Sequence, residues 1–324
     1  MSLKENKEKE LTRWDRFQSL FREEISKTSD VRPTVRYWKS SDLVKVMTAI
    51  RLQHRAELLT TFPKGRAALV RLEKVGWVKP IAITWDAKQS PTLKLYQVQP
   101  YSNDAKTIDP LELLLGYEPK GVVCYFGALQ HYELTTQIPP FYHIAKIRNG
   151  PVPTYPTNGA TTKPTGTSSK AYNPMGTALF TLDGLQFYRT SRYKVHVPGV
   201  QVRLFSGRSG IRITNFEQTL LDTLTHPLQC GGSAVVFEAW DRAADRIDSA
   251  RLLECLEAIN RPALWRRVAA VLTLTQILDN DATLKDAFEK KRIIMDSPTE
   301  HDELSLLPDH EFFQFDPTWR VRIP

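Results

Sequence analysis

Long hydrophobic runs are missing from this 324-residue chain, and no stretch approaches the roughly 20 apolar residues needed to cross a bilayer. Cysteine is also scarce, with only Cys124, Cys230 and Cys255 at wide spacing. An odd number of distant cysteines does not suit the paired framework of a small secreted domain. Because the first ten residues are mostly charged or polar, we expect no secretory signal, no membrane partner and a cytoplasmic location.

The common motifs of catalysis are missing too. The sequence has no GxxxxGK[ST] run, no GxGxxG after a predicted strand and no HExxH. The segment SGRSG at 206–210 lacks the spacing of a serine elbow and lies between two predicted strands, where glycine ordinarily makes a turn. Cys124 with His131, and His226 with Cys230, lack a second pair that would complete a zinc site. We therefore expect no cofactor, no metal and no catalytic residue, and the chain is not expected to be an enzyme.

Positive charge is concentrated at one end. Residues 1–100 contain 20 Lys and Arg against 11 Asp and Glu, a balance of +9, whereas residues 101–324 contain 24 against 25, a balance of −1. A basic excess confined to one region is typical of a module that meets a polyanion. The charge balance therefore divides the chain into a basic N-terminal domain, 1–100, and a nearly neutral second domain, 101–324.

Apolar spacing predicts several helices in the basic region. One apolar stripe at helical spacing comprises Leu11, Trp14, Phe17, Leu20 and Phe21. Further helices are predicted at residues 40–54, 55–62 and 64–75, the last ended by Gly76. A strand follows from Trp77, and residues 84–98 have the turn residues of a two-stranded hairpin.

Three helices followed by a hairpin are the order of a winged helix-turn-helix. In that fold a helix enters the major groove of DNA, and a basic hairpin lies along the phosphates. We place the reading helix at 64–75, and double-stranded DNA is the expected partner. The candidate DNA-binding residues are Lys64, Arg66, Arg71 and Lys74 on that helix, and Lys79 and Lys88 on the strand and the hairpin tip. The alternative is that these charges solvate an ordinary surface helix.

The second domain mixes strands and helices. Helices are predicted at 110–115 and 126–132, and a strand at 141–147. Residues 148–176 are rich in Pro, Gly, Thr and Ser, which predicts a mobile surface loop. Alternating strands follow that loop, and a mostly helical region runs from Asn215 to about residue 288. The chain as a whole is therefore expected to be α+β.

Two local features of the helical region bear on chemistry. Glu217 and Asp222 lie about 140° apart on one predicted helix, so they cannot act as a carboxylate pair on one substrate. Asp222 is expected to bond a neighbouring backbone or Arg group. The segment 226–232, HPLQCGG, is expected to connect two helices, because proline breaks a helix and paired glycines allow a tight reversal. The alternative for this segment is a loop that contacts a partner.

Two stretches of the second domain are distinctive: YFGALQHYELTTQIP at 125–139 and ITNFEQTLLDTLTHPLQCGGSAVVFEAW at 213–240. They resemble the AbiEi family of bacterial antitoxins. The first motif is matched by Gly127, Ala128, Leu129, His131, Tyr132, Leu134, Thr135, Gln137, Ile138 and Pro139. The second is matched by Glu217, Thr219, Leu220, Leu221, Asp222, Pro227, Gly231 and Gly232. A weaker resemblance continues through residues 252–274 and WRVRIP at the end of the sequence.

The resemblance implies a winged-helix N-domain that represses its own operon, through inverted repeats in its promoter, and a mixed α/β antitoxin C-domain. The C-domain is expected to counteract a nucleotidyltransferase toxin of a phage abortive-infection system. The sequence departs from the family in a longer lead, 1–40, in the 148–176 insertion, and at Gly127 and Gln218. Two alternatives are a stand-alone regulator or phage-defence protein without a toxin, and an enzyme that modifies the toxin or a nucleic acid.

Overall fold

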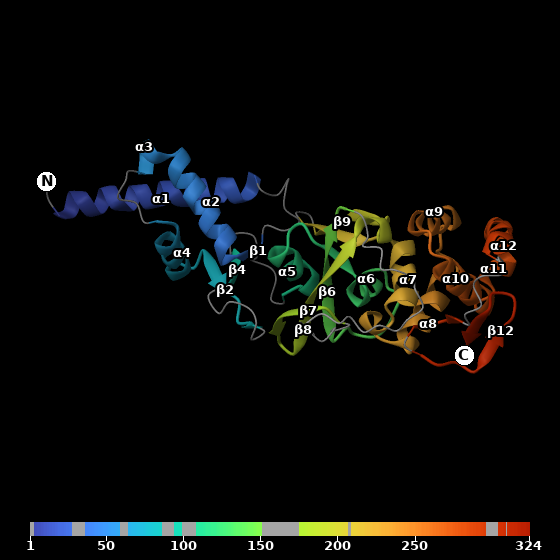
Figure 1. Cartoon of the computed structure of the whole chain (residues 1–324). Helices are drawn as coiled ribbons and strands as arrows, with labels where there is room; N and C mark the ends of the chain where they lie inside the picture. Colours follow the sequence, from blue (N-terminus) through green and yellow to red (C-terminus); the bar gives the residue numbers. More distant parts are fainter. Residues whose placement is uncertain are drawn as a thin grey trace, which may run out of the picture. The chain divides into compact units, whose positions relative to one another are not determined.

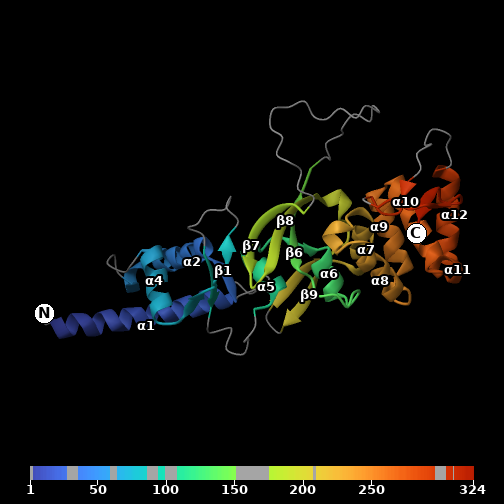
Figure 2. The same cartoon turned by 90° about the horizontal axis from the view of Figure 1, so that it is seen from below.

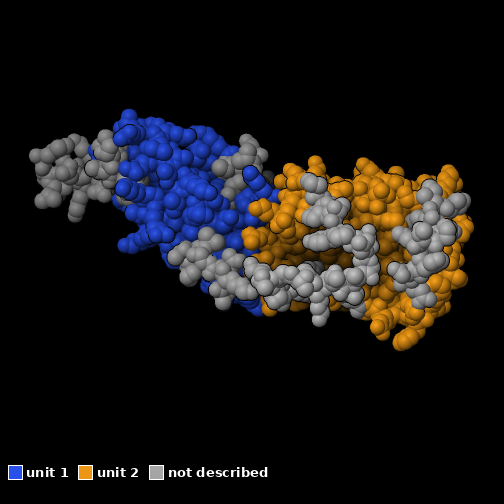
Figure 3. All heavy atoms as spheres, in the orientation of Figure 1, with its two compact units in different colours: residues 1–120, 179–184, 202–211 blue, residues 121–178, 185–201, 212–324 orange. Residues whose placement is uncertain are grey.

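The computed structural model describes residues 3–27, 36–58, 64–85, 94–98, 108–150, 175–206, 209–295, 304–308 and 310–324. The chain divides into two compact units, which Figure 3 colours separately. Unit 1 comprises residues 1–120, 179–184 and 202–211, and unit 2 comprises residues 121–178, 185–201 and 212–324. Helices and sheets both contribute, so the protein is mixed α+β. The division differs from the predicted boundary at 100/101, because 101–120 and two later segments belong to unit 1.

Helices make up most of the described part of unit 1. They are α1 (Leu3–Lys27), α2 (Ser40–Gln53), α3 (Arg55–Leu58), α4 (Gly65–Lys74) and α5 (Pro110–Tyr117). The helices predicted at 40–54 and 64–75 are confirmed as α2 and α4, and the predicted stripe lies on α1. Helix α1 packs against α2, and both views show the two helices as neighbours (Figures 1 and 2).

The core of unit 1 follows from the apolar spacing of these helices. Trp14, Phe17, Leu20 and Phe21 of α1 are all buried, since their spacing places them on one face. They pack in one cluster with buried side chains of other elements, namely Met47, Ile50, Leu69, Leu72, Tyr96 and Val98. The first helix is therefore an integral part of this core.

A three-stranded antiparallel sheet completes this core. It contains β1 (Tyr37–Lys39), β2 (Val78–Pro80) and β4 (Leu95–Val98) in the order β1-β4-β2. The central strand β4 is buried at three of its four residues, which suits its aromatic and aliphatic sequence LYQV.

The predicted hairpin within 84–98 is wrong in its pairing. The first of its two strands, β3 (Thr84–Trp85), pairs with β7 (Thr177–Leu182), with Trp85 opposite Phe180. The ring of Trp85 lies 5.5 Å from that of Phe180 and 6.1 Å from that of Tyr117, whereas both edges of β4 are paired with β1 and β2. The hairpin tip at Lys88 lies outside the described residues.

Unit 2 is built around a sheet whose strands follow the order β8-β6-β5-β10. These strands are β5 (Val122–Cys124), β6 (Phe141–Arg148), β8 (Leu185–Tyr193) and β10 (Ser209–Thr214). Of β10, only residues 212–214 belong to unit 2. The longest ladder is parallel and joins all eight residues of β6 to β8. In contrast, β5 pairs antiparallel with β6 and parallel with β10.

The helical half of unit 2 starts directly after β10. Asn215 caps α7 (Phe216–Thr225), accepting a hydrogen bond at 2.8 Å from the Gln218 amide, as expected for a helix beginning there. The remaining helices are α6 (Phe126–His131), α8 (Ser233–Ala243), α9 (Ser249–Ile259), α10 (Pro262–Leu274), α11 (Ile277–Asn280) and α12 (Ala282–Met295), with short 3-10 turns η3 (Lys194–His196) and η4 (Leu228–Cys230).

Four further strands complete the set. Strand β9 (Val200–Ser206) neighbours β10 in its sheet, and residues 202–206 of β9 belong to unit 1. In unit 2, β11 (Leu304–Ser305), β12 (Gln314–Asp316) and β13 (Val321–Ile323) form a small sheet in the order β11-β13-β12. The expected loop at 148–176 falls mainly on residues 151–174, which lie outside the described residues.

Candidate functional site

The predicted reading helix, α4, packs closely against α2 in unit 1. Ala68, Leu69 and Leu72 form its buried face. At its first residue, Gly65, a Cβ atom would lie only 3.0 Å from Thr48 Oγ1 and Val44 Cγ1 of α2. Glycine therefore permits the close approach of the two helices, and the opposite face of α4 is left exposed.

The exposed face of α4 carries Arg66, Val70 and Lys74. These residues are four positions apart, so they line one stripe of the helix, and Val70 is 49% exposed at its centre. Two more exposed lysines flank the helix, Lys64 just before it and Lys79 on β2. None of these four basic side chains forms an ion pair within the part of the chain that the structure describes. The stripe is consequently available to an anionic partner.

Arg71 occupies a different environment from the other candidates on α4. Its guanidinium carbon lies 4.4 Å from the centre of the Trp14 ring on α1, a cation–π contact that fastens α4 to α1. Next to this contact, the Tyr96 hydroxyl donates to Glu73 at 3.2 Å, and burial, followed by the Glu73 charge, raises the pKa of Tyr96 to about 12. The structure therefore separates Arg71 from the exposed stripe.

Val70 is the residue of this stripe that the sequence reasoning missed. Its signal was present, because 66, 70 and 74 follow a four-residue repeat that is out of phase with the buried positions 68, 69 and 72. An exposed branched apolar side chain between two cations can contact a thymine methyl group.

In unit 2, the two distinctive stretches pack against each other. The Tyr132 hydroxyl donates to the Thr214 carbonyl at 2.7 Å. The carboxylate of Glu238 accepts from the Thr135 hydroxyl at 2.7 Å and from the Thr136 backbone amide at 2.8 Å. Desolvation opposes ionisation of Glu238, but these hydrogen bonds outweigh it and lower the pKa of its carboxyl group. Residues 125–139 and 213–240 therefore share one packed body.

Gly231 of the second stretch packs against Phe126 of the first stretch, where there is no room for a side chain. Its φ is +100°, and a Cβ there would lie 2.6 Å from Phe126 Cε1 and 2.9 Å from Val235 Cγ2. Gly231→Ala is expected to lower the free energy of unfolding by about 3 kcal/mol, because positive-φ strain and overpacking add. Urea unfolding followed by circular dichroism measures the change. Gly184→Ala is the control, since φ is +84° there but nothing lies within 4 Å; equal losses in the two variants would contradict the steric part.

A buried ion pair lies at the centre of unit 2. Both terminal nitrogens of Arg192 donate to the carboxylate of Asp222 at 2.5 Å, and Gln218 Nε2 donates to the same carboxylate at 2.9 Å. Although desolvation opposes its charge, the Asp222 carboxylate raises the pKa of Arg192 above its usual value. The prediction that Asp222 bonds a neighbouring group is confirmed, with Arg192 as the partner.

Backbone strain accompanies this pair. Arg192 Cζ lies 5.2 Å from the centre of the Tyr125 ring, and Tyr125 has a φ of +61° and a ψ of −134° at the start of α6. A non-glycine residue holds that conformation only where the surroundings impose it. The buried ring, packed also against His143 and His226, supplies that constraint.

Two histidines of this region titrate far below their ordinary range. Burial, followed by the nearby Arg192 charge, lowers the pKa of His226 to about 4. Burial also lowers the pKa of His143 to about 4, even though its Nε2 lies 3.0 Å from the Met175 carbonyl. Both rings are therefore neutral in the folded protein at neutral pH.

These depressed pKa values predict acid sensitivity. Between pH 6.5 and pH 4 the unfolded chain protonates these two imidazoles and the folded chain does not, so stability is expected to fall as the pH falls through this window. Each histidine contributes a slope of up to about 1.4 kcal/mol per pH unit. Urea unfolding across the window measures the slope, and His143→Gln is expected to reduce it. An unchanged slope in that variant would show that His143 is not the titrating group.

The described part of the chain offers no metal centre, since no three of its His, Cys, Asp and Glu side chains are placed to hold an ion. Its three cysteines are buried free thiols, and burial raises the pKa of Cys124 to about 12. None of the described helices combines the length and apolar character needed to cross a membrane.

The fold and the site define a mixed α+β protein in two units. No protein-family model and no curated protein matches the sequence. Among solved structures, the chain is similar to the RV2827C protein from Mycobacterium tuberculosis, at 15% identity and a TM-score of 0.48, over 92% of this chain and 88% of that chain. Function therefore has to be argued from the residues of this chain.

Proposed function

We propose that unit 1 binds double-stranded DNA and that α4 is the helix that enters the major groove. The observation that carries the proposal is the exposed stripe of Arg66, Val70 and Lys74 on α4. From Arg66 to Lys74 the helix rises about 12 Å, which is also about the width of the major groove. Arg66 can then reach a guanine edge or a phosphate, Val70 a thymine methyl group, and Lys74 a phosphate.

The order and pairing of the elements support a winged helix-turn-helix. The elements follow one another in the order α1, β1, α2, α3, α4, β2, β3 and β4, and β1, β4 and β2 form one sheet in the order β1-β4-β2. Within this arrangement α2 crosses behind α4 at Gly65, as the first helix of a helix-turn-helix does. Lys79 on β2 extends the basic surface beyond the helix.

Binding of the full-length protein to a fluorescent duplex from the promoter upstream of its gene tests the DNA proposal. Because each neutralised phosphate releases counterions, the logarithm of the association constant is expected to fall with the logarithm of salt concentration, by a slope of about −0.9 per contact. Competition with an unrelated duplex of equal length separates specific from general binding. Affinity that is absent, or that does not respond to salt, would refute the DNA role.

We further propose that the protein is an antitoxin that represses its own operon at inverted repeats and counteracts a nucleotidyltransferase toxin. The support is the resemblance of residues 125–139 and 213–240 to AbiEi antitoxins, together with the hydrogen bonds that tie Thr135 and Thr136 to Glu238 across these two stretches. No step of this role requires turnover by the antitoxin itself.

Coexpression with the product of an adjacent nucleotidyltransferase-like gene tests the antitoxin role. Growth arrest caused by that product is expected to be relieved, and persistent arrest with both proteins well expressed would contradict the proposal. Gly231→Ala serves as a variant of lowered stability in this test. Lys27→Ala, which changes an exposed side chain of α1, serves as a variant of unchanged stability. If no such gene adjoins this one, the stand-alone regulator is favoured instead.

A further inference from the structure

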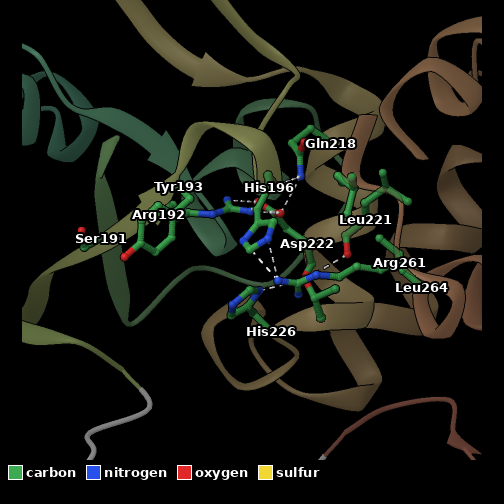
Figure 4. Close-up of a pocket in the computed structure, with 12 residues that line it drawn as sticks. Ser191, Arg192, Tyr193, His196, Gln218, Leu221, Asp222, His226, Arg261 and Leu264 are labelled. Carbon is green, nitrogen blue, oxygen red and sulfur yellow. Dashed lines mark hydrogen bonds and ion pairs between the residues drawn. The ribbon is translucent and has the colours of Figure 1, made fainter. Parts of the chain in front are cut away.

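Unit 2 contains an open pocket of about 150 Å³ beside the buried Arg192–Asp222 pair (Figure 4). Three segments form it: the end of β8 with η3, the middle of α7, and the turn that leads into α10. Figure 4 shows the Arg261 side chain reaching between His196 and His226, with Tyr193 on the opposite wall. The pocket is therefore lined by basic and hydroxyl groups, together with apolar side chains such as Leu221 and Leu264, from distant parts of the chain.

One positive charge of the pocket, that of Arg261, has no carboxylate partner among the described residues. Asp222 is the one carboxylate among the lining residues, and Arg192 already binds both of its oxygens. Arg261 has no carboxylate within ion-pair distance in the described chain; its Nη2 lies 2.8 Å from His196 Nε2 and 3.2 Å from Nδ1. An arginine whose neighbour is an imidazole, in a pocket with no spare carboxylate, provides a positive surface without a counterion.

Burial, and after it the charge of neighbouring arginines, disfavours the charged form of each of these groups. Desolvation, followed by the Arg192 charge, lowers the pKa of Arg261. Desolvation, followed by the charges of Arg261 and Arg192, lowers the pKa of His196. Desolvation, followed by the Arg192 charge, also lowers the pKa of His226, to about 4. An anion placed among them would oppose each of these shifts, because an opposite charge favours the protonated form.

We propose that this pocket binds the phosphate group of a small phosphate monoester or of inorganic phosphate. Arg261 provides the guanidinium fork that grips two oxygens, and His196 and His226 add donors once the anion has raised their protonation. Phosphate suits the site better than acetate, because its second charge and its four oxygens match a set of donors that converge from three segments. This inference goes beyond the proposed function, since it concerns a ligand of unit 2 and requires neither DNA nor a toxin.

Isothermal titration calorimetry of the full-length protein with inorganic phosphate, at constant ionic strength, tests the site. One bound phosphate per chain is expected, with acetate binding at least tenfold more weakly. Arg261→Gln is expected to reduce phosphate affinity at least tenfold. Arg261→Lys keeps the charge but loses the paired guanidinium donors, so its phosphate affinity is expected to lie between those of Arg261→Gln and the wild type. A second titration with a nucleoside 5′-monophosphate distinguishes the sources: tighter binding assigns the site to a nucleotide, and equal or weaker binding assigns it to free phosphate.

The matched control is Arg251→Gln, which removes an equally charged, exposed side chain of α9 that does not line the pocket. It is expected to bind phosphate like the wild type, and circular dichroism establishes that each variant is folded. No binding up to about 10 mM phosphate would overturn the proposal, since a looser site has no cellular relevance. Equal binding by the Arg261→Gln and Arg251→Gln variants would also overturn it, because the anion would then lie elsewhere.

Discussion

Asp222→Ala is expected to lower the free energy of unfolding by about 3–5 kcal/mol, because the change leaves the buried Arg192 guanidinium without its counterion. Arg192 is 7% exposed, and both of its terminal nitrogens bind Asp222, so the change leaves both nitrogens without their ionic partner. Gln218, which donates to the same carboxylate, loses a partner as well. Urea unfolding followed by tryptophan fluorescence measures the loss.

The double variant Arg192→Met with Asp222→Leu separates charge from packing. It removes both ions and retains most of the volume. The double variant is therefore expected to lose less free energy of unfolding than Asp222→Ala does. If Asp222→Ala lost less than about 1 kcal/mol of free energy of unfolding, the pair would contribute no more than an exposed ion pair does. That result would contradict the expected cost of leaving Arg192 buried without its counterion.

The Arg66→Ala and Lys74→Ala double variant is expected to bind the promoter duplex about 100-fold more weakly than the wild type, because each lost contact to a base or phosphate costs about 1–3 kcal/mol. Both side chains are exposed on α4, so the variant is expected to keep its stability. The slope of affinity against salt is expected to fall by about 2 in the same titration, provided that both residues contact phosphates. Fluorescence anisotropy over a salt series measures the two quantities together.

Lys27→Ala is the matched control for charge, since Lys27 is an exposed lysine of α1 that pairs with Glu23 and lies off the α4 stripe. It is expected to bind DNA nearly as the wild type does. If this control weakened binding as much as the double variant, general basicity and not the α4 stripe would explain the affinity.

Elements with strong local patterns could be predicted from the sequence. The stripe containing Trp14 and Phe17, the capping Asn215 and the glycine after α4 each mark a helix through its own spacing or its own ends. Pairing between distant segments could not be predicted in this way. Trp85 was expected to continue a hairpin, whereas its partner Phe180 lies 95 residues further along the chain. The short strands β11 to β13 were also missed, since two or three residues do not establish a period.

The candidate site also contains residues that a local sequence pattern identifies and residues whose role depends on contacts between distant segments. The charge count and the helical pattern identified α4 and the exposed residues Lys64, Arg66 and Lys74. The separate role of Arg71 depends on Trp14 of another helix, so it required the tertiary structure. Asp222 was recognised as a bonding residue, but its partner on β8 carries no local signal.

The division of the chain has a consequence for how the protein is made. The sequence passes between the two units at 120/121, 178/179, 184/185, 201/202 and 211/212. A ribosome releases the N-terminal end first, yet unit 1 lacks its last strands until residue 211 has emerged, by which time much of unit 2 is also present. Early folding of an independent N-terminal domain, which is usual in multidomain chains, is therefore incomplete here. For the same reason, cleavage at a single peptide bond cannot release either unit whole.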